Sequence, residues 1–170
     1  MKYTRKGLFT TVLCILLAGT ALAEENNILR YGSCDQGPKG WYTWQSQGSI
    51  KLETAAIGLN SGKGLQIVAE GESVKGSVSM PFSQTGALTV SGYAASTTTE
   101  KTKIVLQSFD KDGKTVGWID IAHLRNDGKP SQFSKKVTLP ANAKKTNLAV
   151  VLTSSGAVLI DDLSVSPTIN

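Results

Sequence analysis

The chain contains few side chains that could carry out covalent catalysis. Its single histidine, His123, lies far from Cys34, the one cysteine after residue 23, and a catalytic thiol needs a basic partner. Cys34 is better explained as a buried, unreactive side chain. No G-x-S-x-G, H-E-x-x-H or phosphate-binding glycine loop is present, and a carboxylate pair such as Asp120 with Asp127 would need a particular separation across a cleft. We therefore predict that the protein is not an enzyme.

The first 23 residues have the three parts of an export signal. Lys2, Arg5 and Lys6 are basic, residues 8–17 are apolar, and Ala21-Leu22-Ala23 is a small-x-small cleavage site, so the mature chain is expected to begin with Glu24. The apolar run is shorter than the roughly 20 residues that span a bilayer, which argues against membrane insertion. We predict an exported protein, periplasmic or extracellular, with one domain over residues 24–170. Cys14 raises a lipoprotein alternative, but it lies inside the apolar run.

The charge excludes one class of partner. The formal net charge is +5, and three of the basic residues belong to the export signal. The remaining excess is too small, and too little clustered, for a nucleic-acid-binding surface. Lys135-Lys136 and Lys144-Lys145 are the only basic pairs after the signal, and we expect both at solvated strand ends. No nucleic-acid partner is predicted.

Hydrophobic residues alternate with polar ones along most of the chain after the signal. Short runs of this kind, ended by Gly, Asn, Asp or Pro, are typical of antiparallel strands in a sandwich or barrel. About ten strands are predicted, and they leave little room for helices. Their ranges are 27–31, 49–54, 64–69, 74–80, 87–95, 103–109, 115–123, 132–139, 147–153 and 157–165.

Several segments, in this order along the chain, are similar to those of jelly-roll carbohydrate-binding modules associated with xylanases and cellulases. The segments are Asn27 to Ser33 with Gly40-Trp41, Ala87 to Ala94, Leu106 to Gly113, Val137 to Ala143 and Ile160 to Val165. The resemblance covers nearly the whole mature chain. It implies an all-β, antiparallel jelly-roll β-sandwich of the galactose-binding-domain-like type, and it raises the expectation of a glycan ligand.

Sugar recognition needs flat aromatic surfaces with hydroxyl, amide or carboxylate groups nearby. If Leu88, Val90 and Gly92 point into the core, alternation places Tyr93 on the outer face of the same strand. Tyr93 would then be available to a ligand.

Three further residues complete the predicted sugar site. Gln107 and Trp118 lie in the next two strands and are candidates for the same outer face, and Trp44 lies near the place where the resemblance puts a binding rim. Trp41 matches the structural tryptophan of the resembled modules and is expected in the core. Each aromatic ring of the predicted site can also be explained as a core side chain, and its burial decides between the two.

A structural Ca²⁺ ion is implied by the resemblance. In the resembled modules an acidic turn near the N-terminus meets the closing Asp-Asp strand, and the matching positions here are Asp35 and Asp161, with Glu53 as a weaker candidate. The segment Asp110-Lys111-Asp112-Gly113 shares two ligand types with an EF-hand loop but lacks the others, so a hairpin turn explains it better. Zinc is disfavoured by the shortage of His and Cys.

These observations predict an exported, non-catalytic glycan-binding module that recognises a poly- or oligosaccharide through surface aromatic rings. The alternative is a structural or protein-interaction domain of the bacterial cell envelope that has this fold and binds no sugar. The two hypotheses differ in one feature. A sugar binder exposes aromatic rings together with polar groups on one face, whereas a spacer buries them.

Overall fold

The computed structural model describes residues 26–60 and 62–168, so the predicted export signal lies outside the described residues. All regular elements in the described part are strands, and none of it forms a helix long and apolar enough to cross a membrane. The strands are β1 Tyr42–Ala55, β2 Gly64–Phe82, β3 Ala87–Ser96, β4 Lys103–Phe109, β5 Thr115–His123, β6 Ser131–Thr138, β7 Lys145–Leu152 and β8 Gly156–Pro167.

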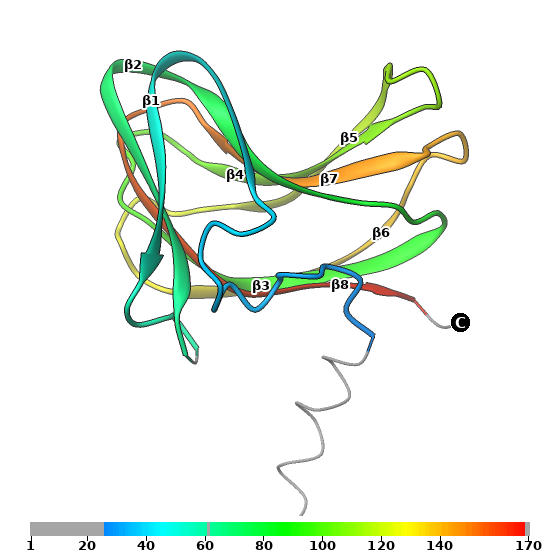
Figure 1. The fold of residues 1–170 in the computed structure, drawn as a ribbon, viewed down its shortest axis with the longest axis horizontal. Helices are drawn as coiled ribbons and strands as arrows, with labels where there is room; N and C mark the ends of the chain where they lie inside the picture. The colour runs from blue at the N-terminus through cyan, green and yellow to red at the C-terminus, as the bar shows by residue number, and fades with distance from the viewer. Residues whose placement is uncertain (1–25, 61, 169–170) are drawn as a thin grey trace, which may run out of the picture.

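The strands form two packed layers that share β2 (Figure 1). The C-terminal half of β2 pairs with β7, and the layer continues through β4 to β5. The N-terminal half of β2 pairs with β8, and this second layer continues through β3 to β6. β1 follows β2 through both layers as its antiparallel partner. The predicted all-β, antiparallel jelly-roll sandwich is confirmed.

The crossing of β2 between layers is visible in its burial pattern. Leu65 and Ile67 are buried in the first half, and Val78 and Met80 are buried in the second, so the buried positions change from odd to even numbers. Because side chains alternate strictly along a regular strand, such a change needs an irregularity. Gly71, with φ 129°, lies in the exposed stretch between the halves, and β1 has its register shifts opposite this stretch.

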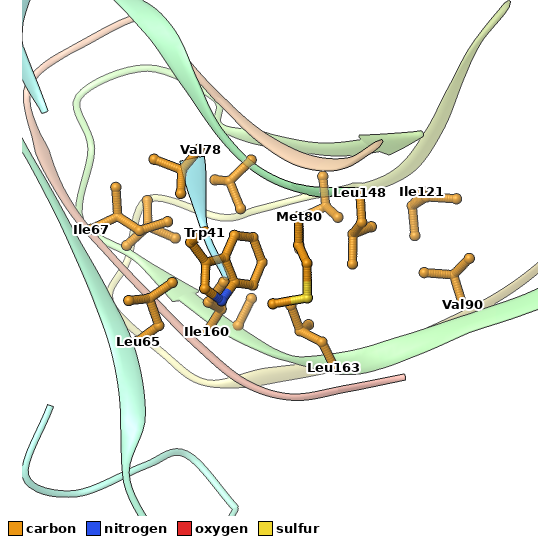
Figure 2. Close-up of a cluster of buried hydrophobic side chains, with 14 of the residues drawn as sticks. Trp41, Leu65, Ile67, Val78, Met80, Val90, Ile121, Leu148, Ile160 and Leu163 are labelled. Carbon is orange, nitrogen blue, oxygen red and sulfur yellow. The ribbon is translucent and has the colours of Figure 1, made fainter. Parts of the chain in front are cut away.

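The core lies between the two layers (Figure 2). Met80 and Leu148 enter it from the first layer, and Ile160 and Leu163 enter it from the second. Trp41, which is 7% exposed, is part of this core, as the sequence predicted. Burial of each large apolar side chain contributes about 1.5–3 kcal/mol relative to exposure, so the apolar alternation specifies which face of each strand turns inward.

Eight strands are observed where about ten were predicted. The predicted strands 64–69 and 74–80 are the two halves of β2. Residues 27–31 are not a strand, although the Asn27 side chain and the Ile28 amide bond to β8. β1 also begins earlier than predicted, at Tyr42, and this difference changes the placement of Trp44.

Candidate functional site

The outward positions of the first layer form a continuous surface, called here the open face. The backbone register places its residues in three rows across the strands. These rows are Tyr42–Ser79–Ala149–Val105–Asp120, Trp44–Ser77–Val151–Lys103–His123 and Pro81–Asn147–Gln107–Trp118. Paired residues of antiparallel strands project from the same side of a sheet, so each row is a line of neighbouring side chains.

Aromatic rings lie at the two margins of the open face. Tyr42 and Trp44 on β1 are 64% and 63% exposed, and Trp118 on β5 is 56% exposed. Val105 and Ala149, at the centre, also point outward but are each only 2% exposed. Neighbouring side chains therefore cover the centre of the face, whereas the aromatic rings at its margins are accessible. Five strands at a spacing of about 4.8 Å make the face roughly 19 Å wide, which is room for more than one sugar ring.

Polar groups lie between the aromatic margins. On β5, Asp120 Oδ2 accepts a hydrogen bond from Lys103 Nζ at 3.1 Å and lies 3.2 Å from His123 Nε2. The hydrogen bond from Lys103 lowers the pKa of Asp120 below its usual value, so the carboxylate is charged at neutral pH. On β2, Ser77 and Ser79 add half-buried hydroxyl groups to the face. These groups can donate to and accept from sugar hydroxyls.

The structure brings three of the four predicted sugar-site residues onto the open face. Gln107 and Trp118 are direct cross-strand partners on β4 and β5, and Trp44 lies at the opposite margin. Tyr42 was not among the predicted site residues. In a strand, its two-residue spacing from Trp44 places both side chains on the same face. The predicted strand begins only at residue 49, so alternation was not applied to Tyr42 and Trp44.

Tyr93 does not share this surface. Alternation placed its strand correctly, because Leu88, Val90 and Ala94 are buried and Tyr93 turns away from the core, where it is half-buried. Its strand β3, however, belongs to the second layer, between β6 and β8. A surface that combines Tyr93 with Trp118 is therefore not formed, because alternation along one strand says nothing about which layer contains it.

The predicted metal residues both contact the segment before β2. Lys63 N donates to Asp35 Oδ1 at 2.9 Å. Asp161, which is fully buried, accepts the amides of Leu59 and Asn60 on Oδ2 at 2.8 and 2.9 Å. The N-terminal turn also meets the closing strand, because Leu163 N donates to Gly32 O at 2.7 Å. The predicted meeting of the two segments is thus present. We call it the carboxylate corner, and it consists of Cys34, Asp35, Asp161, Asp162 and residues 58–60 and 62–63.

The donors around these carboxylates do not fit a calcium ion. Ca²⁺ binds six to eight oxygen atoms through their lone pairs. The oxygens of Asp161 instead face N–H groups, because Oδ1 also accepts the Asp162 amide at 2.9 Å. Asn60 presents its Nδ2 donor to Asp162 Oδ2 at 2.7 Å. Across residues 26–60 and 62–168, no three His, Cys, Asp or Glu side chains form a group suited to a metal ion. The calcium prediction stays untested.

Cys34 lies in the same corner and is buried. Burial, together with the negative charges of Asp161 and Asp162, raises the pKa of its thiol to about 12. The Sγ atom lies 3.4 Å from the carbonyl oxygen of Gly32, to which it donates. Cys34 is therefore an un-ionised structural thiol at neutral pH, in agreement with its interpretation as a small buried hydrophobic residue.

Comparison with known sequences yields no relative: no protein-family model and no curated protein matches the chain. Comparison with solved structures yields many. The enzymatically active domain of bacteriophage CBA120 tailspike protein 4 superposes with a TM-score of 0.72 at 14% identity over 83% of this chain, and the chain spans only 21% of that protein.

Carbohydrate-binding modules of similar size also superpose. A CBM4 module matches with a TM-score of 0.62 at 14% identity, over 82% of this chain and 99% of the module. TmCBM61, solved in complex with β-1,4-galactotriose, matches with a TM-score of 0.58 at 15% identity, over 84% of this chain and 99% of the module. At such identities the likeness establishes the fold alone. The chain has the jelly-roll β-sandwich fold of carbohydrate-binding modules.

Proposed function

We propose that the protein is an exported, non-catalytic module that binds a poly- or oligosaccharide on the open face. The observation that carries this proposal is the presence of three exposed aromatic rings, Tyr42, Trp44 and Trp118, at the margins of one sheet surface. Exposed apolar patches rimmed by polar residues often mark binding sites. Rings at both margins, with polar groups between them, suit a ligand that has apolar faces and many hydroxyls.

The composition of the open face supports binding rather than hydrolysis. Glycoside hydrolysis commonly uses two carboxylic acids on opposite sides of the scissile bond. The three rows of the open face contain one carboxylate, Asp120, and it is held by Lys103 and His123. Its low pKa also makes it unsuited to donate a proton near neutral pH.

The structural neighbours support the same class of ligand. A CBM22 module of Paenibacillus barcinonensis Xyn10C, with a TM-score of 0.56 at 14% identity over 77% of this chain, is described as a xylan-binding domain, and the CBM61 structure contains a galactotriose. Those ligands belong to those proteins. For this chain we propose the broader class, a glycan.

The export proposal is supported by the basic, apolar and small-residue segments that end at Ala23. Mass spectrometry of the secreted protein is expected to give Glu24 as the N-terminal residue. A mature species that retains a lipid-modified Cys14 would contradict the proposed cleavage.

A glycan array with the mature protein, probed with and without Ca²⁺, tests the proposed function. Binding to a defined set of glycans supports the proposal. If no glycan binds while the protein remains folded by circular dichroism, the proposal fails, and the hypothesis of a protein-interaction domain of the cell envelope takes its place. Cross-linking in the envelope would then identify the partner.

A further inference from the structure

One end of the open face is more basic than the rest of it. A pocket of about 490 Å³ lies between the turn that joins β4 to β5 and the start of β7, with Phe109, Lys144, Lys145 and Asn147 among its lining residues. The backbone holds the two sides together, because Lys144 N donates to Phe109 O at 2.7 Å. We call this pocket the basic end.

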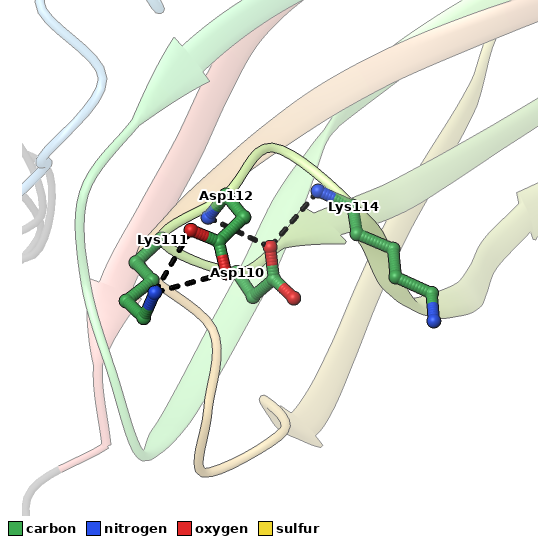
Figure 3. A network of polar contacts seen from close by, with 4 residues as sticks. All are labelled: Asp110, Lys111, Asp112 and Lys114. Atoms are coloured by element: carbon green, nitrogen blue, oxygen red, sulfur yellow. Dashed lines mark hydrogen bonds and ion pairs between the residues drawn. The ribbon is translucent and has the colours of Figure 1, made fainter.

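The acidic groups of the adjoining turn are already occupied (Figure 3). Asp110 Oδ1 accepts hydrogen bonds from the amides of Asp112 and Lys114 at 3.0 and 2.9 Å. These bonds stabilise the turn between β4 and β5. Asp112 forms an ion pair with Lys111, with its two oxygens 2.8 and 2.9 Å from Lys111 Nζ. Asp110 also lines the pocket, and neutral amide donors do not cancel its formal charge, but the two lysines of the opposite wall outnumber it, so the lining has a net positive charge.

Lys144 and Lys145 are exposed and make no ion pair within the part of the chain that the structure describes. Both lysines line the pocket, so an anionic group placed there would be attracted by two ammonium groups. The basic end thus has positive charge that the fold does not neutralise.

Asn147 adds a polar amide to the lining of the pocket. Its Oδ1 atom is buried and has no hydrogen-bond partner among the described residues. Buried acceptors without partners are rare, and each calls for an explanation. Because Oδ1 is enclosed by the protein, a ligand in the pocket meets this side chain through its NH₂ group, which can donate to a carboxylate or hydroxyl oxygen.

The basic end continues the open face. Asn147 is the cross-strand partner of Gln107, and Gln107 is the partner of Trp118, so the backbones of Asn147 and Trp118 are two strand spacings, about 10 Å, apart. Phe109 and Lys145 form the next pair on the same face. A glycan that stacks on Trp118 can therefore place a neighbouring sugar unit in the pocket.

We propose that the basic end binds the carboxylate of a uronic acid, so that the ligand of the open face is an acidic polysaccharide. This inference rests on the proposed glycan-binding function. Lys144 and Lys145 pair with the carboxylate, Asn147 binds an adjacent hydroxyl, and the half-buried Phe109 ring lines the pocket beside the sugar.

The test compares glycans that differ only in the charge of the carboxylate. Affinity is measured for polygalacturonate against its fully methyl-esterified form, and for glucuronoxylan against the same xylan after its uronic acids have been reduced. The acidic member of at least one pair should bind about tenfold more tightly at low salt. The preference should shrink as salt screens the ion pairs.

Variants assign the preference to the pocket. The Lys144→Gln, Lys145→Gln double variant should lose most of the preference and retain its affinity for the neutral member within about twofold. Lys129→Gln with Lys136→Gln is the matched control, because it removes the same charge from exposed lysines outside the pocket lining and should change nothing. Melting temperatures show whether each variant is folded.

The outcomes separate this inference from the proposed function. Equal binding of neutral and acidic members, or a preference that survives in the double variant, overturns the acidic-sugar inference and leaves glycan binding intact. Binding of dextran sulfate in preference to both uronate polymers overturns it in favour of a sulfate ester. Failure of every glycan to bind contradicts the proposed function itself.

Discussion

The open face and the carboxylate corner both contain residue types that suggest a ligand. They differ in how far these side chains already interact with other groups of the protein. Trp44 and Trp118 on the open face are more than half exposed. In the corner, Asp161 accepts three backbone amides and Asp35 accepts one. Exposed rings remain available to a partner, whereas carboxylates bonded to amides already contribute to the fold.

The comparison shows why residue type alone does not identify a site. Exposing a large aromatic ring to water forgoes the stabilisation that burial would provide, so three such rings on one face need an explanation outside the fold. A buried carboxylate is costly unless hydrogen bonds compensate it. The three amide bonds to Asp161 contribute such compensation.

Removal of the Asp161 carboxylate should produce the largest effect. In Asp161→Ala the part-buried amides of Leu59, Asn60 and Asp162 lose their acceptor. Unsatisfied buried groups cost about 1–3 kcal/mol each, and partial rehydration reduces the sum, so we expect a loss of about 3 kcal/mol in the free energy of unfolding. Urea denaturation measures it.

Asp161→Asn is the matched control, because its amide keeps one acceptor oxygen and a similar shape. It should cost less than the alanine variant. If Asp161→Ala changed stability by less than 1 kcal/mol, the corner would not be structural, and the contrast with the open face would disappear.

Loss of an aromatic ring from the open face should reduce binding and leave folding intact. A ring stacked on a sugar contributes about 1–3 kcal/mol, by analogy with aromatic burial. Trp44→Ala and Trp118→Ala should therefore each weaken glycan affinity about tenfold or more, with the melting temperature within a few degrees of wild type. Isothermal titration calorimetry and thermal melting measure the two effects.

Tyr93→Ala sharpens this comparison, because Tyr93 faces outward from the other layer. We expect its glycan affinity to match that of the wild type. A loss equal to that of the tryptophan variants would place the ligand across both layers and contradict the assignment of the site to the open face.

Much of the fold could be predicted from the sequence, because alternation reports which side of a strand is buried. The strands from β3 to β8 agree with their predicted ranges within two residues at each end. The difference lies in β2, where exposed residues around Gly71 separate two runs of opposite phase. In the sequence this stretch has the composition of a turn, and only the pairing with β1 shows that the strand continues.

The site was less predictable, because it depends on which strands become neighbours. Gln107 and Trp118 could be predicted together, since their strands form a hairpin. Trp44 lies on the same face as these two residues only because β2 and β7 are placed between its strand and theirs. Asn147 carried no signal in the sequence, because an unsatisfied buried oxygen is a property of the folded chain.

The ion pair of Asp120 should have a smaller effect. Lys103 lowers its pKa in the folded protein, so the pair stabilises the fold above the usual pKa of the carboxyl, near 3.8, and this contribution is lost as the pH falls through the lowered value. Both side chains are 44% exposed, which limits the contribution to under about 1 kcal/mol. The stability difference between wild type and Asp120→Asn should be present at pH 7 and vanish near pH 2; a difference that persists at pH 2 would contradict this origin.

Chelation of metal should have the smallest effect and bears most directly on the carboxylate corner. A calcium ion bound only to the folded state would add about 2.7 kcal/mol at a hundredfold excess over its Kd, which corresponds to a change in melting temperature of roughly 5–10 °C for a domain of this size. Because amides already occupy the oxygens of Asp161, we expect a change below about 2 °C when EDTA replaces calcium, measured by differential scanning calorimetry. A larger change that is absent from Asp161→Asn would show that calcium displaces those amides. The corner would then be a ligand site like the open face, and exposure alone would no longer distinguish the two regions.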